Sequence, residues 1–98
     1  MTEFSERVIN IIKAIPAGRV ASYSRIAEIA GNPRAARQVS RLLHSSSEKH
    51  NLPWHRVIGS AGTISLRGEG ALIQRGLLES EGIEFGLSGS VDMSRYSI

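Results

Sequence analysis

The sequence contains no cysteine, and this absence excludes several kinds of site at once. Without thiols the chain cannot form disulfide bonds, bind zinc through thiolates or use a sulfur nucleophile in catalysis. Aromatic residues are scarce, at 5%, and Trp54 is the single tryptophan. No apolar run approaches the roughly 20 residues that a membrane-spanning helix needs. No basic leader precedes an apolar block near the N-terminus, so we expect no export signal and a soluble, cytoplasmic protein.

What the chain has instead is positive charge. Its 98 residues suit one domain, and the formal net charge is +3. Most of the twelve basic residues are arginines, whose rigid fork of donors suits phosphates and base edges. The composition therefore favours a nucleic-acid partner, although charge alone fits a small basic protein with a solvated surface equally well.

The N-terminal half predicts three helices. The first carries apolar residues at helical spacing from Phe4 to Ile15, with Thr2 or Ser5 as N-cap and Pro16 as the stop. Ser22 is placed to cap a second, short helix that ends at Gly31.

The third helix is predicted to begin at Pro33 with Asn32 as its cap. Arginines at intervals of three and four line one face, opposite an apolar side, and they are Arg34, Arg37 and Arg41. Two short helices joined by a tight turn, the second one basic, are typical of a helix-turn-helix that enters a DNA groove. The alternative is an ordinary helical hairpin with a solvated basic face.

Beyond residue 43 the pattern becomes less regular. Residues 44–53 predict a loop, and residues 56–66 predict a short hairpin or wing around Gly59 to Gly62. A last helix, ending at Gly82, is expected to turn four apolar residues inward: Leu72, Ile73, Leu77 and Leu78. We predict a mainly α, winged-helix-like single domain over residues 1–86 with at most a short β-hairpin, and a loosely held tail over 87–98.

Four ordered segments carry a family resemblance: IPAGRVASY, GNPRAAR, PWHRVIG and LLESEG. Over roughly residues 4 to 86 the chain resembles the DNA-binding and active-site domain of the O6-alkylguanine-DNA alkyltransferases. In that family a Pro-Cys-His-Arg-Val motif carries the cysteine that accepts the alkyl group. Trp54 stands at the cysteine position, as in the cysteine-free alkyltransferase-like proteins. An indole cannot replace the activated thiolate that alkyl transfer requires, so we expect no catalytic residue.

The resemblance implies that this domain rotates a damaged nucleotide out of the duplex. Tyr23 would press on the adjacent phosphate, and Arg37 would fill the gap in the base stack, offsetting the few kcal/mol of lost stacking. Arg34 and Arg41 would contact the DNA backbone from a helix in the minor groove. The alternatives are a half-buried core aromatic for Tyr23 and a solvated charge for Arg37.

The resemblance also assigns a lesion pocket. The backbone carbonyls of Trp54 and Val57 would accept the guanine exocyclic amine, and the indole would offer an apolar face to the alkyl group. Arg67 stands where transferases more often carry a tyrosine, and its cation would stack on the base and sense its electronic character. Pro53 and the pair His55 and Glu81 would form the scaffold, with the glutamate fixing the histidine. No metal or cofactor is expected.

The predicted function is a non-enzymatic sensor that binds duplex DNA containing O6-alkylguanine as a monomer and marks it for nucleotide excision repair proteins. It would associate with the nucleoid only when bound to DNA. One alternative is a sequence-specific regulator whose Arg34, Arg37 and Arg41 read bases in the major groove. The other is a hydrolytic dealkylase or glycosylase in which His55 and Glu81 activate water.

Overall fold

The computed structural model describes residues 2–98, and most of its regular structure is helical. This confirms the predicted mainly α fold class. None of the helices among these residues is long and apolar enough to span a membrane. In chain order the elements are α1 (Glu3–Lys13), β1 (Ala21–Ser22), α2 (Tyr23–Ile29), α3 (Ala36–Ser46), the 3-10 helix η1 (Trp54–Arg56), β2 (Val57–Ile58), α4 (Gly68–Ser80) and α5 (Met93–Tyr96).

The first two helices begin where their caps were predicted. The Thr2 hydroxyl accepts a hydrogen bond from the Ser5 N–H at 3.1 Å, which starts α1. The Ser22 hydroxyl accepts from the Arg25 N–H at 3.0 Å, which starts α2. Each cap satisfies one of the donors that the first turn leaves without an intrahelical partner.

Helix α3 begins later than predicted, and Asn32 is not its cap. The Asn32 side chain accepts from the Arg34 N–H at 3.2 Å, so it closes a local turn that precedes the helix. Regular helix starts at Ala36, and the residue before it makes no side-chain cap. The turn over residues 30–35 still joins α2 to α3, which pack together as the predicted helix-turn-helix.

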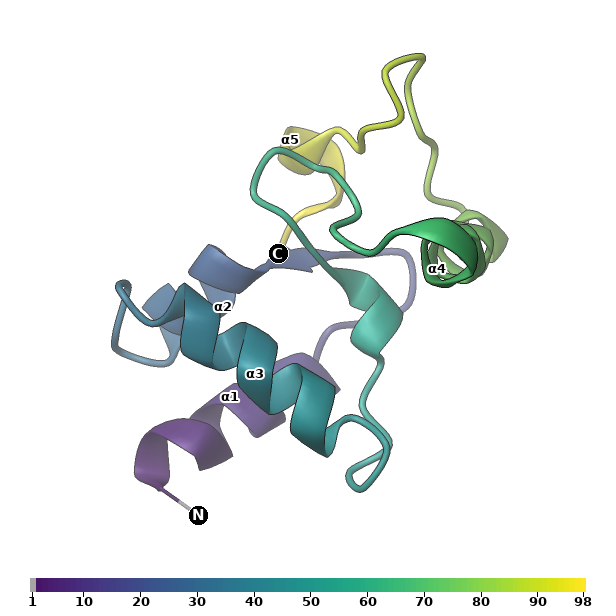
Figure 1. Cartoon of the computed structure of the whole chain (residues 1–98). Helices are drawn as coiled ribbons and strands as arrows, with labels where there is room; N and C mark the ends of the chain where they lie inside the picture. Colours follow the sequence, from purple (N-terminus) through teal and green to yellow (C-terminus); the bar gives the residue numbers. More distant parts are fainter. Residues whose placement is uncertain (1) are drawn as a thin grey trace.

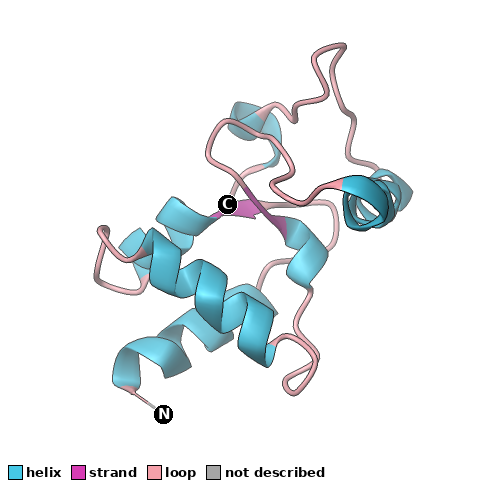
Figure 2. Ribbon diagram, in the orientation of Figure 1, coloured by secondary structure: helices cyan, strands magenta, loops and turns pink. Residues whose placement is uncertain are grey.

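The strands are parallel, and the hairpin predicted around Gly59 does not form. β1 pairs with β2 through Ala21 with Val57 and Ser22 with Ile58. Gly59 and Gly62 instead close a tight turn, in which the Gly59 N–H donates to the Thr63 carbonyl at 2.9 Å. Val57 and Ile58 are fully buried, so β2 lies in the interior of the protein. Its partner there is β1, which is distant in the sequence. Figure 2 shows this small sheet between the helices.

The buried apolar residues form two clusters on either side of this sheet. One lies among α1, α2 and α3, on the left of Figure 1, and includes Val8, Ile12, Ile26 and Val39. The other lies toward α4 and α5 and consists of Val20, Ile58, Leu78, Ile83, Val91 and Tyr96. The adjacent strand residues Val57 and Ile58 therefore contribute to different clusters.

The expectation of a loosely held tail is wrong. Val91 and Tyr96 are buried in the second cluster. The Ile98 N–H donates to the Val20 carbonyl at 2.9 Å, and the Tyr96 hydroxyl accepts from the Glu84 N–H at 3.2 Å. Two apolar side chains and these backbone bonds are enough to fix a segment of low overall hydrophobicity. The domain boundary at residue 86 stays a prediction.

Helix α4 turns only one of the four apolar residues inward that the sequence predicted. Leu78 is fully buried, but Leu72 is 73% exposed and Ile73 and Leu77 are exposed as well. The spacing of apolar residues identifies an apolar stripe on a helix, but it does not show whether another element packs against that stripe. Here the neighbour of α4 is η1, and the side chain that α4 buries there is Gln74.

Gly62 supports the packing of the tail, because its backbone approaches Val91 closely. Its φ is +81°, and an added Cβ would stand 2.2 Å from the Val91 carbonyl oxygen. Gly62→Ala should therefore lower the free energy of unfolding by roughly 1–2 kcal/mol of backbone strain plus roughly 1–3 kcal/mol of overpacking. Chemical denaturation followed by circular dichroism measures this loss.

Gly89→Ala is the matched control, since Gly89 has a φ of +82° and nothing lies near an added Cβ. It should show the strain cost alone. Equal losses for the two variants would contradict the close approach of the tail to residue 62.

Candidate functional site

One face of α3 and of the turn before it is basic and unneutralised. Arg34, Arg37 and Arg41 are all exposed, as predicted. Every ion pair found among residues 2–98 involves other basic residues. Because no carboxylate within the described chain forms an ion pair with these three residues, their charges are available to anions such as the phosphates of nucleic acids.

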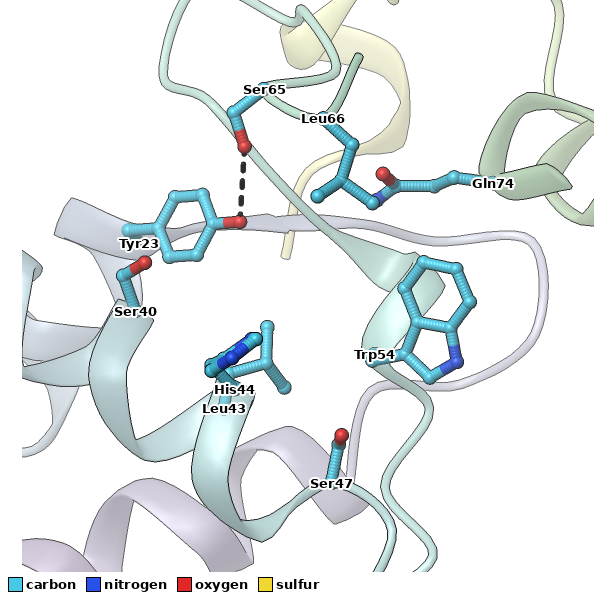
Figure 3. A pocket seen from close by; sticks show the side chains of 9 residues that line it. All are labelled: Tyr23, Ser40, Leu43, His44, Ser47, Trp54, Ser65, Leu66 and Gln74. Carbon is cyan, nitrogen blue, oxygen red and sulfur yellow. Dashed lines mark hydrogen bonds between the residues drawn. The ribbon is translucent and has the colours of Figure 1, made fainter. Parts of the chain in front are cut away.

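A cavity of about 280 Å³ lies beside this face, between α3 and η1. Ligand pockets are usually about 300–1,000 Å³, so this one is small and suits a single ring system. Figure 3 shows side chains entering it from α2, α3, η1, α4 and the segment before α4. The lining residues are Tyr23, Ser40, Leu43, His44, Ser47, Trp54, Ser65, Leu66 and Gln74.

Tyr23 and Trp54 stand on opposite sides of this cavity (Figure 3). Tyr23 is the first residue of α2, and its hydroxyl lies 3.3 Å from the Ser65 hydroxyl. Trp54 opens η1, is half-buried and meets the His55 ring edge-on, with centroids 6.2 Å apart. Two aromatic side chains thus flank a space in which a flat ring could lie.

The other predicted pocket residues lie around the cavity without lining it. Val57 is 1% exposed, and its carbonyl accepts a hydrogen bond from Gln74. Arg67 is exposed immediately before α4. Pro53 precedes η1 and is half-buried. The structure therefore gathers Tyr23 and Trp54 directly at the cavity and leaves these three outside its lining.

Behind the cavity, one carboxylate holds several segments together. Glu81, at the C-terminal end of α4, accepts from the His55 Nε2 at 2.7 Å, as the family resemblance implied. Arg56 binds the same carboxylate through Nε at 3.0 Å and Nη2 at 2.8 Å, and its Nη1 donates to the Ile15 carbonyl. The Gly18 N–H adds a further bond at 3.0 Å. Arg56 is thus a member of this network that the sequence did not reveal.

The network shifts the acidity of Glu81. Hydrogen bonds from Arg56, with smaller contributions from His55 and the Gly18 amide, lower its pKa from 4.5 to about 2, against the opposing effect of burial. Its side chain is 14% exposed, so the ion pair with Arg56 is only weakly screened by water. The carboxylate remains charged throughout the physiological range, which suits a structural ion pair.

Gln74 is the most buried polar residue beside the cavity, at 3% exposure. Its amide nitrogen donates to the carbonyls of His55 at 3.1 Å and Val57 at 3.0 Å, which fixes the loop carrying Trp54. Its Oε1 is buried and has no partner. Leaving such an acceptor unsatisfied costs about 1–3 kcal/mol, so the amide is held at an energetic cost.

Sequence reasoning missed most of the lining. It missed four polar residues: Ser40, His44, Ser47 and Ser65. It also missed Leu43, Leu66 and Gln74. A polar residue within the apolar stretch ALIQRGLL was the one available signal for Gln74. No group of three histidine, aspartate or glutamate side chains suited to a metal ion occurs among residues 2–98.

Comparison with known proteins identifies the family. Residues 3–83 match the family described as 6-O-methylguanine DNA methyltransferase, DNA binding domain. The chain belongs to this family. A DNA base-flipping protein from Escherichia coli (strain K12) is 47% identical over 93 residues, which cover 95% of this chain and 72% of that relative. Alkyltransferase-like protein 1 from Schizosaccharomyces pombe is 42% identical over 86 residues, 86% and 80% of the two chains.

The structural comparison agrees with the sequence comparison. S. pombe Atl1 in complex with damaged DNA containing O6-carboxymethylguanine superposes with a TM-score of 0.84 at 36% identity, covering 100% of this chain and 96% of that chain. The expected resemblance and fold are therefore confirmed. Since the chain contains no cysteine, it is a member of the methyltransferase family that lacks the alkyl acceptor.

The Glu81 network generates a prediction for acid stability. Because the folded-state pKa lies below the ordinary value of 4.5, the carboxylate stabilises the fold fully above about pH 4.5, and this stability is lost as the pH falls toward 2. At about 1.4 kcal/mol per pKa unit, the stabilisation is about 3 kcal/mol. Glu81→Gln should lose about this amount at pH 7 and show a flatter decline in unfolding free energy between pH 4.5 and 2.

Glu79→Gln is the control, because Glu79 is an exposed carboxylate on the same helix that pairs only with exposed Arg75. Urea titrations at several pH values measure both variants. An acid limb in Glu81→Gln as steep as that of the wild type would contradict the assignment.

Proposed function

We propose that this protein binds duplex DNA, turns O6-alkylguanine out of the base stack and holds it between Tyr23 and Trp54 without transferring the alkyl group. The observation that carries this proposal is a cavity sized for one ring system beside an unneutralised arginine face, in a cysteine-free member of the family. The likeness to Atl1, which was crystallised with O6-carboxymethylguanine DNA, supports the choice of lesion.

The arginine face supplies the DNA contact. Arg37 lies in the first turn of α3, where its long side chain can enter the stack at the position that the extruded base leaves. Arg34 in the preceding turn and Arg41 one turn along α3 flank it and bind the phosphates. An inserted side chain kinks the duplex and offsets the lost stacking, so the bound DNA is bent.

The cavity supplies the lesion site. Tyr23 stands at its edge at the start of the recognition motif, where its hydroxyl reaches the adjacent phosphate. Trp54 offers an apolar ring on which alkyl groups of different size can pack. Arg67, exposed before α4, stacks on the base from outside the lining.

The arrangement favours binding over hydrolysis. His55 and Glu81 are engaged with each other, and Arg56 occupies the same carboxylate. Neither His55 nor Glu81 lines the cavity. A general base must lie within hydrogen-bonding reach of the water that it activates at the substrate, so this pair is better suited to holding η1 in place.

A protein that binds a lesion without repairing it requires a further step to be useful. We infer that the bent, protein-marked site is passed to damage-recognition proteins of nucleotide excision repair, and that one monomer marks each lesion. A sequence-specific regulator would instead show an affinity set by the surrounding bases, which separates the two functions experimentally.

The direct test is a competition titration of matched duplexes with and without one O6-methylguanine, at stated salt concentration. The lesion duplex should bind at least about tenfold more tightly, a difference of about 1.4 kcal/mol, in any sequence context.

Arg37→Ala should weaken lesion binding by about tenfold, since nothing then fills the gap. Arg95→Ala, the same charge change on α5, should leave the preference intact. Equal affinity for the two duplexes would refute the proposed function.

Arg67→Ala should lower the ratio of lesion to plain-DNA affinity by about fivefold, because a cation stacked on a base contributes about 1 kcal/mol. Arg67→Lys keeps the charge without the flat guanidinium and should retain part of the ratio. Fluorescence anisotropy on the same two duplexes measures it. A ratio unchanged in Arg67→Ala would exclude this residue from lesion recognition.

A further inference from the structure

Gln74 is positioned to do more than fix the loop that carries Trp54. It enters the cavity from α4, and Figure 3 shows its amide directed toward the side on which Tyr23 and Ser65 lie. The orientation of the amide is determined by its partners, because its nitrogen has two carbonyl acceptors, those of His55 and Val57. Turning the amide over would place its oxygen against both carbonyls. The Gln74 Oε1 atom therefore points away from the carbonyls of His55 and Val57.

The two carbonyls that the family resemblance assigns to a guanine amine each accept at least one hydrogen bond already, although a carbonyl oxygen can accept two. The Trp54 carbonyl accepts from the Val57 N–H within η1. The Val57 carbonyl accepts from Gln74. By contrast, Gln74 Oε1 is buried beside the cavity with both lone pairs unused. Among the buried side-chain N and O atoms of the cavity lining, it is the one without a hydrogen-bond partner in the described chain.

The chemistry of the lesion identifies what such an acceptor can recognise. Alkylation at O6 leaves the ring N1 without its proton, so the oxygen and N1 on the pairing edge only accept hydrogen bonds. The exocyclic 2-amino group is the one donor left on that edge. We propose that Gln74 Oε1 accepts a hydrogen bond from this amine and makes the pocket selective for 2-aminopurine bases. This inference rests on the proposed function.

Leu66 lines the same cavity as Gln74. Its Cδ1 lies 3.6 Å from where a Cβ on Gly70 would stand, so Leu66 packs over the first turn of α4, one turn before Gln74. Leu66 is 46% exposed. A base that enters the cavity would therefore meet this partly exposed apolar side chain as well as the Gln74 amide.

The test compares three duplexes that differ at one base: guanine, O6-methylguanine and 6-methoxypurine. The last carries the same methoxy group as O6-methylguanine and lacks the 2-amine. The wild type should bind the O6-methylguanine duplex about tenfold more tightly than the 6-methoxypurine duplex. In Gln74→Met, of similar size without an acceptor oxygen, this ratio should fall to about one. Gln38→Met, which changes the other glutamine, exposed on α3, should keep the ratio.

A second measurement does not depend on the variant's stability. With glutamine labelled with 13C at the side-chain carbonyl, the wild type gives two signals, from Gln38 and Gln74. The Gln74 signal should move when the O6-methylguanine duplex is added and stay near its free position with the 6-methoxypurine duplex. The Gln38 signal should respond alike to both.

The outcomes separate the two proposals. A wild type that does not distinguish O6-methylguanine from guanine refutes the proposed function. A wild type that does so, but binds 6-methoxypurine equally well, refutes the role of Gln74. A Gln74 signal that responds alike to both methoxy bases, or a ratio that Gln74→Met leaves intact, refutes it too.

Discussion

The carboxylate of Glu81 is the interaction on which the rest of this structure depends. It binds Arg56 and His55 of η1 and the amide of Gly18, and through Arg56 it reaches the Ile15 carbonyl at the end of the first core cluster. The segment that carries Trp54 is thereby fixed between two hydrophobic clusters. An ion pair with this many partners satisfies the condition under which a poorly solvated charge remains stabilising.

The parts of this protein that we propose for recognition are held in place without a cysteine. The arginine face of α3, the aromatic pair Tyr23 and Trp54, and the network around Glu81 are fixed by helix caps, packing and hydrogen bonds that involve no thiol. Trp54, which the family resemblance places at the cysteine position, forms part of the cavity wall, and the chain contains no cysteine to accept an alkyl group. Under the proposed function, the free energy of binding serves to mark the lesion and leaves it chemically unchanged.

The sequence predicted those parts of the fold that local chemistry determines. The caps Thr2 and Ser22 and the exposed arginines of α3 follow from side-chain hydrogen bonding and helical spacing. What depended on distant partners was not predictable: Leu72 of α4 faces solvent, and Val57 pairs with β1 instead of forming a hairpin. For the site, the resemblance supplied Tyr23 and Trp54, whereas Gln74 emerged only once its carbonyl partners, 17 and 19 residues away, were in place.

The central claim is that the pocket recognises an alkylated base without reacting with it. Mass spectrometry of both components after prolonged incubation at saturating concentration tests this most directly. The account predicts that the polypeptide and the O6-methylguanine strand are each recovered at their original mass from a complex that formed fully. A protein heavier by one methyl group, or a strand that has lost its methyl group or its base, would contradict it.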